Sequence, residues 1–330
     1  MSNRVLMSDV AELAGVSLQT VSRVVNGSAA VSDATRRKVT QAIKTLGYRP
    51  NLAARSLAAG QSSALGVLLT GDVDYGMSSA FRAVEHAARE QGYYLCVATA
   101  AEPSRYGMAL GQLVDQRVAG CVVLARSADV LSALAKHAPQ LPICLVLTGQ
   151  PATAHTAVVS VDQETGIRLL VSHLIEQGAT SLVHIAGDMS WDDAVIRATV
   201  FENYCRERGV LGRIVQGGGW SAKAGYHAAN AIIAAGTPDA IVACNDNIAF
   251  GVLRALHEHA ITVPEQVMVT GFDDSPMCEW SCPSLTTVTQ DFTALGTAAL
   301  TALTGILEGN QPSHTILTPE LVVRESTNKE

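Results

Sequence analysis

The sequence predicts an α/β protein with a small helical segment at its N-terminus, on three observations. The chain has 330 residues, 48% hydrophobic and 16% charged, so it is long enough for two or three domains and too apolar to be disordered. From residue 62 onward, short apolar runs alternate with stretches of helical length. Before residue 62, three short amphipathic helices are expected. The net charge of this segment is positive, whereas that of the rest of the chain is negative.

The charge difference divides the chain into a basic head and an acidic body. Residues 1–60 hold eight Arg and Lys against three Asp and Glu, whereas the rest of the chain brings the net charge to −7. A basic module on an acidic body is typical of a polyanion-binding domain attached to something else. The alternative is a chance excess of basic residues on an exposed helix. We expect a head at residues 1–48, a linker at 49–61 and a body at 62–330.

Three helices are expected in the head, each with a recognisable boundary. Gly15 ends the first, Ser17 caps the second, and the third runs from a cap at Ser32 to Gly47. The apolar residues at helical spacing are Val10, Leu13 and Ala14; Val21, Val24 and Val25; and Val39, Ala42, Ile43 and Leu46. Only three residues separate the first two helices, which is the connection of a helix-turn-helix motif.

The second helix presents a polar arc suited to reading DNA. Opposite its valines lie Leu18, Gln19, Ser22, Arg23 and Asn26. Gln and Arg can make paired hydrogen bonds to base edges in a major groove, and Ser and Asn can serve bases or phosphates. An exposed polar helix face is the alternative interpretation. The turn, the basic charge and the polar arc together predict binding to double-stranded DNA.

The linker at residues 49–61 is rich in alanine and leucine, which favour helix. A helix this short is marginal in water and would form only when it packs on something. Leu57 could then enter a minor groove as an apolar wedge that kinks the duplex; otherwise the segment is an interdomain linker. The candidate DNA contacts are completed by Ser17, Thr20, Tyr48, Asn51 and Ala54.

The body is expected to contain parallel sheets covered by helices on both faces. The apolar runs that predict its strands are residues 65–69, 95–98, 121–124, 144–147, 158–161, 182–186, 241–243 and 267–270. The length of the body suits two doubly wound units rather than one. The triple glycine at 217–219 is expected to be a loop that does not follow a strand. All seven cysteines are expected to be reduced.

Ligands of open α/β sheets bind beyond the carboxyl ends of the strands, so polar residues just past the apolar runs are candidate pocket residues. These are Thr70, Asp72, Asp188, Ser190, Asn245, Asp246, Asp273, Asp274 and Gln290. With Arg197 and Trp220 they offer polar groups for hydroxyls and an aromatic face for a sugar ring. Asp246 precedes an apolar helical run and is expected to be a helix cap rather than a ligand.

The chain resembles the LacI/GalR family of bacterial transcriptional repressors. The segments that carry the resemblance are 10–17, 19–26, 47–51, 219–222, 243–246, 271–274 and 285–292. The resemblance implies a helix-turn-helix headpiece whose Leu18, Gln19 and Arg23 read bases, and a hinge whose Leu57 enters the minor groove. It also implies a periplasmic-binding-protein-like core, with subdomains at about 62–161 plus 291–320 and 162–290 plus 321–330.

The resemblance further implies an effector site in the core, for a small sugar such as a galactoside. The positions that match inducer contacts are Arg197, Trp220, Asn245, Asp273, Gln290 and Phe292. A wall after the first strand would fall near residues 70–77, with Thr70, Asp72 and Tyr75 as candidates. A family member has a polar residue after its third strand and another after its fourth. The matching positions in this chain are 124–126 and 147–148. The segment Trp191-Asp192-Asp193 could close over the ligand or form a solvated loop.

The expected partners are a pseudo-palindromic operator, a small-molecule effector and a second copy of the chain. The chain ends without a leucine heptad, so a dimer is expected rather than a tetramer. No apolar run of membrane-spanning length and no signal peptide is found, which indicates a cytoplasmic protein. No cofactor, metal or enzymatic activity is predicted, because the acidic pairs 192–193 and 273–274 lack an accompanying nucleophile. A corepressed or purine-responsive regulator remains the alternative.

Overall fold

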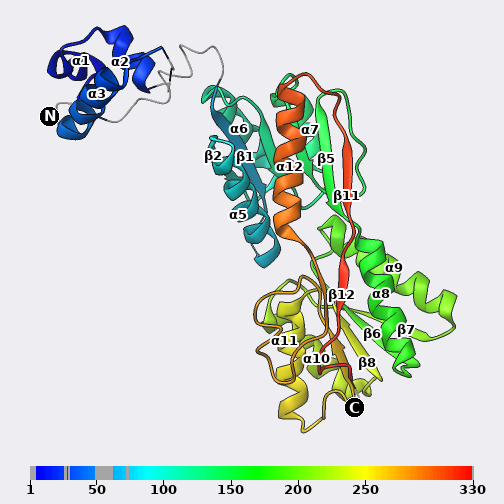
Figure 1. Ribbon diagram of the computed structural model, residues 1–330. Helices are drawn as coiled ribbons and strands as arrows, with labels where there is room; N and C mark the ends of the chain where they lie inside the picture. The colour runs from blue at the N-terminus through cyan, green and yellow to red at the C-terminus, as the bar shows by residue number, and fades with distance from the viewer. Residues whose placement is uncertain (1–4, 26–27, 29, 49–61, 72–73, 329–330) are drawn as a thin grey trace. The chain divides into compact units, whose positions relative to one another are not determined.

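The computed structural model describes residues 5–25, 28, 30–48, 62–71 and 74–328, in two compact units (Figure 1). The first unit ends at Ser63, and the second runs from Ala64 to the end of the chain. Among the described residues, no helix is both long enough and apolar enough to cross a lipid bilayer. The cysteines are all free thiols, as expected, and only Cys282 is exposed.

The first unit contains the three expected helices, α1 (Met7–Ala14), α2 (Leu18–Val25) and α3 (Asp33–Leu46). Ser17 and Ser32 accept the backbone N–H of Thr20 and Thr35, so both caps are confirmed. Gly15 and Gly47 end α1 and α3 with positive φ angles of 64° and 62°, which glycine adopts without strain.

The prediction that Leu13 belongs to the core of the head was wrong. Leu13 is 53% exposed, whereas Ala11 is buried with Val10 and Ala14. The buried arc of α1 runs from Val10 through Ala14 to Ala11, so Leu13 falls beyond its edge. Ala11 extends the buried arc on the side away from Leu13.

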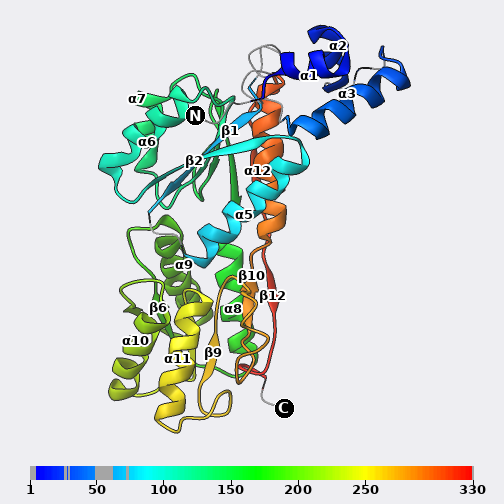
Figure 2. The same cartoon turned by 90° about the vertical axis from the view of Figure 1, so that its left-hand side faces the viewer.

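The second unit begins with a six-stranded parallel sheet in the order β11-β5-β4-β3-β1-β2. Its strands are β1 (Ala64–Thr70), β2 (Tyr94–Ala100), β3 (Cys121–Leu124), β4 (Ile143–Val146), β5 (Thr156–Val161) and β11 (His314–Leu317). Helices α5 (Tyr75–Glu90) and α12 (Phe292–Leu307) cover one face (Figure 2), and α6 (Pro103–Asp115) and α7 (Val130–His137) cover the other. This doubly wound layer is the first subdomain.

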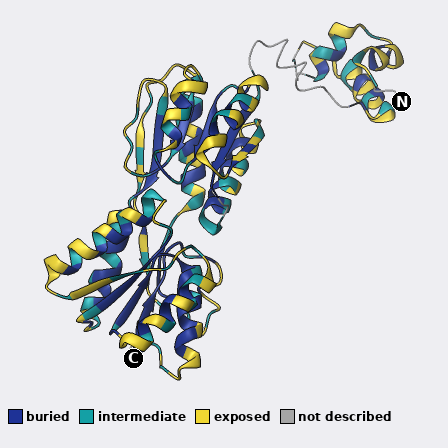
Figure 3. Ribbon diagram, turned by 180° about the vertical axis from the view of Figure 1, so that it is seen from behind, coloured by how far each residue is buried: buried dark blue, intermediate teal, exposed yellow. Residues whose placement is uncertain are grey.

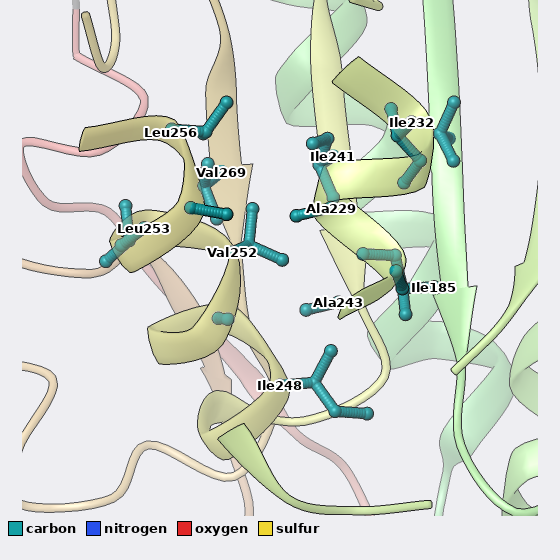
Figure 4. Close-up of a cluster of buried hydrophobic side chains, with 14 of the residues drawn as sticks. Ile185, Ala229, Ile232, Ile241, Ala243, Ile248, Val252, Leu253, Leu256 and Val269 are labelled. Atoms are coloured by element: carbon teal, nitrogen blue, oxygen red, sulfur yellow. The ribbon is translucent and has the colours of Figure 1, made fainter. Parts of the chain in front are cut away.

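The second subdomain is a four-stranded parallel sheet in the order β7-β6-β8-β9. Its strands are β6 (Ser181–Ala186), β7 (Leu211–Gln216), β8 (Ala240–Ala243) and β9 (Met268–Thr270). Helices α8 (Gln163–Glu176) and α9 (Asp192–Arg208) cover one face, and α10 (Ala222–Ala235) and α11 (Asp246–Glu258) cover the other. Figure 4 shows the apolar cluster beneath α10 and α11, and Figure 3 shows the buried strands of both sheets.

The chain passes between the two subdomains three times. It does so from β5 into α8, from β10 (Thr287–Thr289) into α12, and from β11 into β12 (Glu320–Val322). Strands β10 and β12 pair antiparallel with each other. Neither subdomain is therefore a continuous stretch of sequence.

All eight strands predicted from apolar runs are present, but four further strands were not predicted. One of these, β7, lies at the edge of its sheet with Leu211 76% exposed, so it has no continuous apolar run. Because β7 ends at Gln216, the triple glycine does follow a strand, and that prediction was wrong.

Candidate functional site

The reading face of α2 is exposed as the sequence indicates. Leu18, Gln19 and Arg23 are all solvent-exposed, with Leu18 at 54%, while Val21 and Val24 on the opposite side are buried. The helix therefore combines an apolar attachment face with a polar outer face. That arrangement leaves the predicted base-reading side chains accessible.

The other predicted DNA contacts have mixed surroundings. The hydroxyls of Ser17 and Thr20 hydrogen-bond each other at 2.9 Å, and Ser22 is partly buried. Tyr48 is 8% exposed and packs in the core of the head. The predicted contacts that lie outside the described residues are Asn26, Asn51, Ala54 and Leu57.

A cavity in the second unit lies at the carboxyl ends of strands from both sheets. Five of the predicted effector residues line it: Arg197, Trp220, Asp273, Gln290 and Phe292. Trp191 and Asp193, from the segment that could close over a ligand, line it as well. The wall expected near residues 70–77 contributes Asp74, Gly76 and Met77. Side chains of both subdomains therefore face one space.

Arg197 organises the polar side of this cavity. It is only 3% exposed, and its Nε donates to Gln163 Oε1 at 2.8 Å while Nη1 donates to the carbonyl oxygen of Cys244. Its guanidinium lies 3.7 Å from the ring centroid of Phe272. These contacts fix the guanidinium on three sides and leave little freedom for it to turn.

The hydrogen bonds continue from Gln163 to the carboxylate of Asp273. Gln163 Nε2 donates to Gln290 Oε1 at 3.4 Å, and Gln290 Nε2 donates to Asp273 Oδ1 at 2.6 Å. Asp273 is 6% exposed and has a φ of +115°, a backbone conformation that L residues rarely adopt. The side-chain amides of Gln163 and Gln290 thus connect the Arg197 guanidinium to the buried Asp273 carboxylate, whose backbone is strained.

Two indole rings form the apolar side of the cavity. The ring centroids of Trp191 and Trp220 are 5.1 Å apart, with the planes inclined by 55°. A Cβ at Gly187 would come within 2.8 Å of the Trp220 ring, so the glycine lets the indole lie directly on the backbone after β6. Across the cavity, Phe292 meets Tyr75 edge to face at 5.9 Å between centroids.

Burial governs the electrostatics of the carboxylates. It raises the pKa of Asp74 and raises the pKa of Asp273 well above its usual value, although the Arg197 guanidinium opposes both shifts. Asp74 also caps α5 by accepting the N–H of Met77 at 2.9 Å. Among the described residues, no group of three His, Cys, Asp or Glu is arranged to hold a metal ion.

Three predicted effector residues do not line the cavity. Thr70 is buried and accepts the backbone N–H of Arg126 at 3.0 Å. Asn245 caps α11 through Ile248 N–H, and its amide donates to the carbonyl oxygen of Trp220 at 3.3 Å, so it positions the indole instead. Tyr75 faces a separate surface groove at the start of α5. Asp72 lies outside the described part of the chain.

The expected cap at Asp246 was also wrong, because Asn245 takes that position. The Asp246 carboxylate is buried and accepts the N–H of Ser275 and the hydroxyl of Thr287, both at 2.6 Å. It therefore ties the start of α11 to the loops after β9 and before β10. Asp246 does not line the cavity, so the alternative role as a ligand finds no support either.

Four polar residues that line the cavity were not chosen as pocket residues from the sequence: Ser160 and Gln163 were missed, and Asp74 and Thr148 appeared only within the ranges 70–77 and 147–148. The signal for two of them was available. Thr148 comes directly after the apolar run 144–147, and Gln163 follows β5 by two residues. The rule that polar residues past a strand line the pocket identifies both once it is applied to every strand.

Comparison with known proteins gives two family matches. Residues 6–51 match the model of bacterial regulatory proteins of the lacI family, and residues 171–327 match a periplasmic binding protein-like domain. The Escherichia coli lactose operon repressor is 31% identical over 331 residues, which cover 98% of this chain and 90% of that protein. The HTH-type transcriptional repressor PurR of Pasteurella multocida is 31% identical over 97% of this chain and 98% of its own length.

Solved structures are similar over nearly the whole chain. A crystal structure of the Lac repressor bound to ONPG in the repressed state superimposes with a TM-score of 0.88 at 30% identity, covering 98% of this chain and 100% of that one. A complex of the transcriptional regulator CelR with cellobiose gives a TM-score of 0.72 at 29% identity, covering 98% and 100%.

Proposed function

The chain belongs to the lacI family of bacterial regulatory proteins, and on that premise we propose that a small sugar bound beside Arg197, Trp220 and Asp273 controls its affinity for operator DNA. The family makes the chain a DNA-binding transcriptional regulator with a ligand-binding core. The identity of the ligand, and the residues that hold it, are the proposal.

The observation that carries the proposal is a pair of unpartnered polar atoms in the cavity wall. Trp220 Nε1 and Asp193 Oδ1 are buried and have no hydrogen-bond partner among the described residues. A buried donor or acceptor without a partner costs about 1–3 kcal/mol, so such atoms are rare unless something else fills the site. A sugar supplies hydroxyls that can donate to a carboxylate and accept from an indole, and its C–H face packs on the aromatic rings.

The cavity also suits control of DNA binding, because both subdomains contribute to it. Asp74 and Phe292 belong to the first subdomain, while Arg197, Trp220 and Asp273 belong to the second. A ligand that contacts both sides stabilises one relative arrangement of the subdomains over others. A coupling of about 1–3 kcal/mol between the two sites would change operator affinity by roughly 5- to 150-fold.

On the DNA side, we propose that two copies of the chain bind a pseudo-palindromic operator as a dimer. Leu18, Gln19 and Arg23 would contact base edges in the major groove, and Leu57 would enter the minor groove between the two half-sites. Replacing Arg23 with alanine should abolish discrimination between operator and random DNA. Measured binding to both DNAs would test this, and unchanged discrimination would exclude Arg23 from the reading face.

The test of the effector is a fluorescence titration of the purified protein with galactosides, glucosides, pentosides and purines. Trp191 and Trp220 line the cavity, so a true ligand should change their emission. The ligand that binds is then added to an operator-binding assay. A sugar that binds and alters operator affinity supports the proposal, and saturable binding by a purine alone contradicts it.

A corepressed or purine-responsive regulator is the second candidate. Two observations favour it: the similarity to the HTH-type repressor PurR equals that to the lactose operon repressor, and two indoles line the cavity. A purine ring could stack on these indoles. The same titration separates the two candidates, and the DNA assay gives the sign of the response.

A further inference from the structure

The cavity walls carry an excess of negative charge. Three carboxylates line the cavity, those of Asp74, Asp193 and Asp273, and Arg197 is the one Lys or Arg among the described lining residues. One carboxylate is enough to accept from a sugar hydroxyl, and neutral amides and hydroxyls can bind the others, so an uncharged ligand leaves the excess negative charge unbalanced.

We propose that the effector carries a positive charge, and that it is an amino sugar or a similar small polyol with a protonated amine. This inference rests on the proposed function, since it assumes that the cavity is the effector site. It differs from that function in naming a charged ligand class that neutral galactosides, glucosides and purines do not represent.

Arg197 does not neutralise the three carboxylates. Two of its donors, on Nε and Nη1, are used by Gln163 and by the carbonyl oxygen of Cys244, and its flat face lies on Phe272. None of the ion pairs formed by the described residues joins it to Asp74, Asp193 or Asp273. The guanidinium weakens the repulsion between the carboxylates only from a distance.

The protein leaves acceptor oxygens of all three carboxylates available to a ligand. Asp193 Oδ1 is buried without a partner. Asp74 uses Oδ1 to cap α5, and Asp273 uses Oδ1 to accept from Gln290. A buried or half-buried carboxylate that is neither paired nor fully hydrogen-bonded is unfavourable, and the raised pKa values of the half-buried Asp74 and the buried Asp273 reflect that cost.

An ammonium group would relieve this cost, and the rest of the wall fits the remainder of an amino sugar. The ammonium has three donors and no acceptor, which matches Asp193 Oδ1 and the second carboxyl oxygens of Asp74 and Asp273, and its charge favours the ionised form of these groups. The two indoles offer ring faces for the sugar's C–H side and attract a nearby cation. Gln290 and Arg197 remain in reach of the hydroxyls as cavity-lining groups.

The experiment compares matched ligands that differ at one substituent: galactose, galactosamine and N-acetylgalactosamine, and the corresponding glucose series. Binding is followed by tryptophan emission and by the change in operator affinity. We expect the free amine to bind at least about tenfold more tightly than either neutral analogue of the same sugar. The acetylated sugar is the important control, because it keeps the nitrogen and removes the charge.

Variants of the full-length protein test the carboxylates directly. Asp193→Asn and Asp74→Asn should each weaken binding of the amine more than binding of the neutral sugar, so that the preference for the amine falls. Asparagine caps a helix as well as aspartate, so α5 should remain intact in the second variant. Glu202→Gln removes an exposed carboxylate from α9, the helix that carries Asp193, and should leave the preference unchanged.

The outcomes separate this inference from the proposed function. A neutral sugar that binds and alters operator affinity, with no gain from the amine, overturns the charged-ligand inference and leaves the sugar-responsive regulator standing. An amine preference that survives in both aspartate variants also overturns it. If only purines bind, both the inference and the proposed function are wrong.

Discussion

Helices α10 and α11 cross so closely at two glycines that a single methyl group should separate them. A Cβ at Gly251 would overlap the carbonyl oxygen of Ala222 and lie 2.6 Å from the amide nitrogen of Tyr226. A Cβ at Gly225 would overlap the carbonyl oxygen of Ile248 on the facing helix. These are backbone atoms, which cannot rotate aside as a side chain could.

We predict that Gly251→Ala destabilises the second unit by about 2 kcal/mol. Overpacking costs about 1–3 kcal/mol, and a clash with backbone places the cost at the upper end of that range. From the value of about 3 kcal/mol, set by the clash with backbone atoms of α10 alone, we subtract about 1 kcal/mol because alanine is the better helix former. The apolar cluster that has to shift includes Val252, Ala229 and Ile232 (Figure 4).

Calorimetry should show the loss as a fall in Tm of roughly 4–8 °C for a unit of this size. The matched control is Gly305→Ala in α12, where the nearest atom to a new Cβ is Asn310 Nδ2 at 3.5 Å. That variant should be neutral or stabilised by up to about 1 kcal/mol. Equal effects at the two positions would refute the reasoning, because the propensity change is the same and only the surroundings differ.

Three other substitutions test the cavity itself. Arg197→Lys should destabilise the protein by about 2–3 kcal/mol in urea unfolding. An ammonium can replace neither the forked guanidinium that hydrogen-bonds Gln163 and the Cys244 carbonyl nor its contact with Phe272. An unchanged midpoint of unfolding would contradict this prediction. Asp273→Asn should raise stability, and most at high pH. Because burial raises the pKa of Asp273 in the folded state, the wild type binds an extra proton there and loses stability as pH rises from the usual aspartate pKa toward the raised one. Parallel stability–pH curves for the variant and the wild type would argue against this. Gly187→Ala should displace the Trp220 indole and shift its fluorescence emission. Effector binding should weaken about tenfold, since overpacking costs about 1–3 kcal/mol. An unaltered emission spectrum would show that the ring tolerates the methyl group.

The sequence predicted the strands that contain an apolar run, most of them buried on both faces and one of them the partly exposed edge strand β2, and missed those that do not. Strand β3 is buried at every residue and reads as a continuous apolar run. Strands β7, β11 and β12 are exposed or half-buried at every residue, and β10 is buried but only three residues long. Periodicity carries little information for such short or exposed strands.

The candidate site was predicted in part, and the predicted residues that do not line the cavity share a feature. Asn245 and Thr70 follow strands, as pocket residues do, but their side chains satisfy backbone N–H groups instead. Local capping and ligand binding favour the same residue types at the same positions, so sequence alone does not separate them. Asp74 does both, since one of its oxygens caps α5 while the residue also lines the cavity.

The three passages of the chain between the subdomains have a consequence for synthesis on the ribosome. One face of the first sheet is completed by Leu295, Leu300 and Leu303 of α12, and its edge by β11. Strands β1 to β5 and helix α5 emerge far earlier, so the part of this face beneath α12 stays uncovered until almost the whole polypeptide has been made. A premature stop after β10 would therefore remove the inner cover of the first subdomain rather than a dispensable tail. Such a product should aggregate or be degraded, although every residue of the headpiece is present.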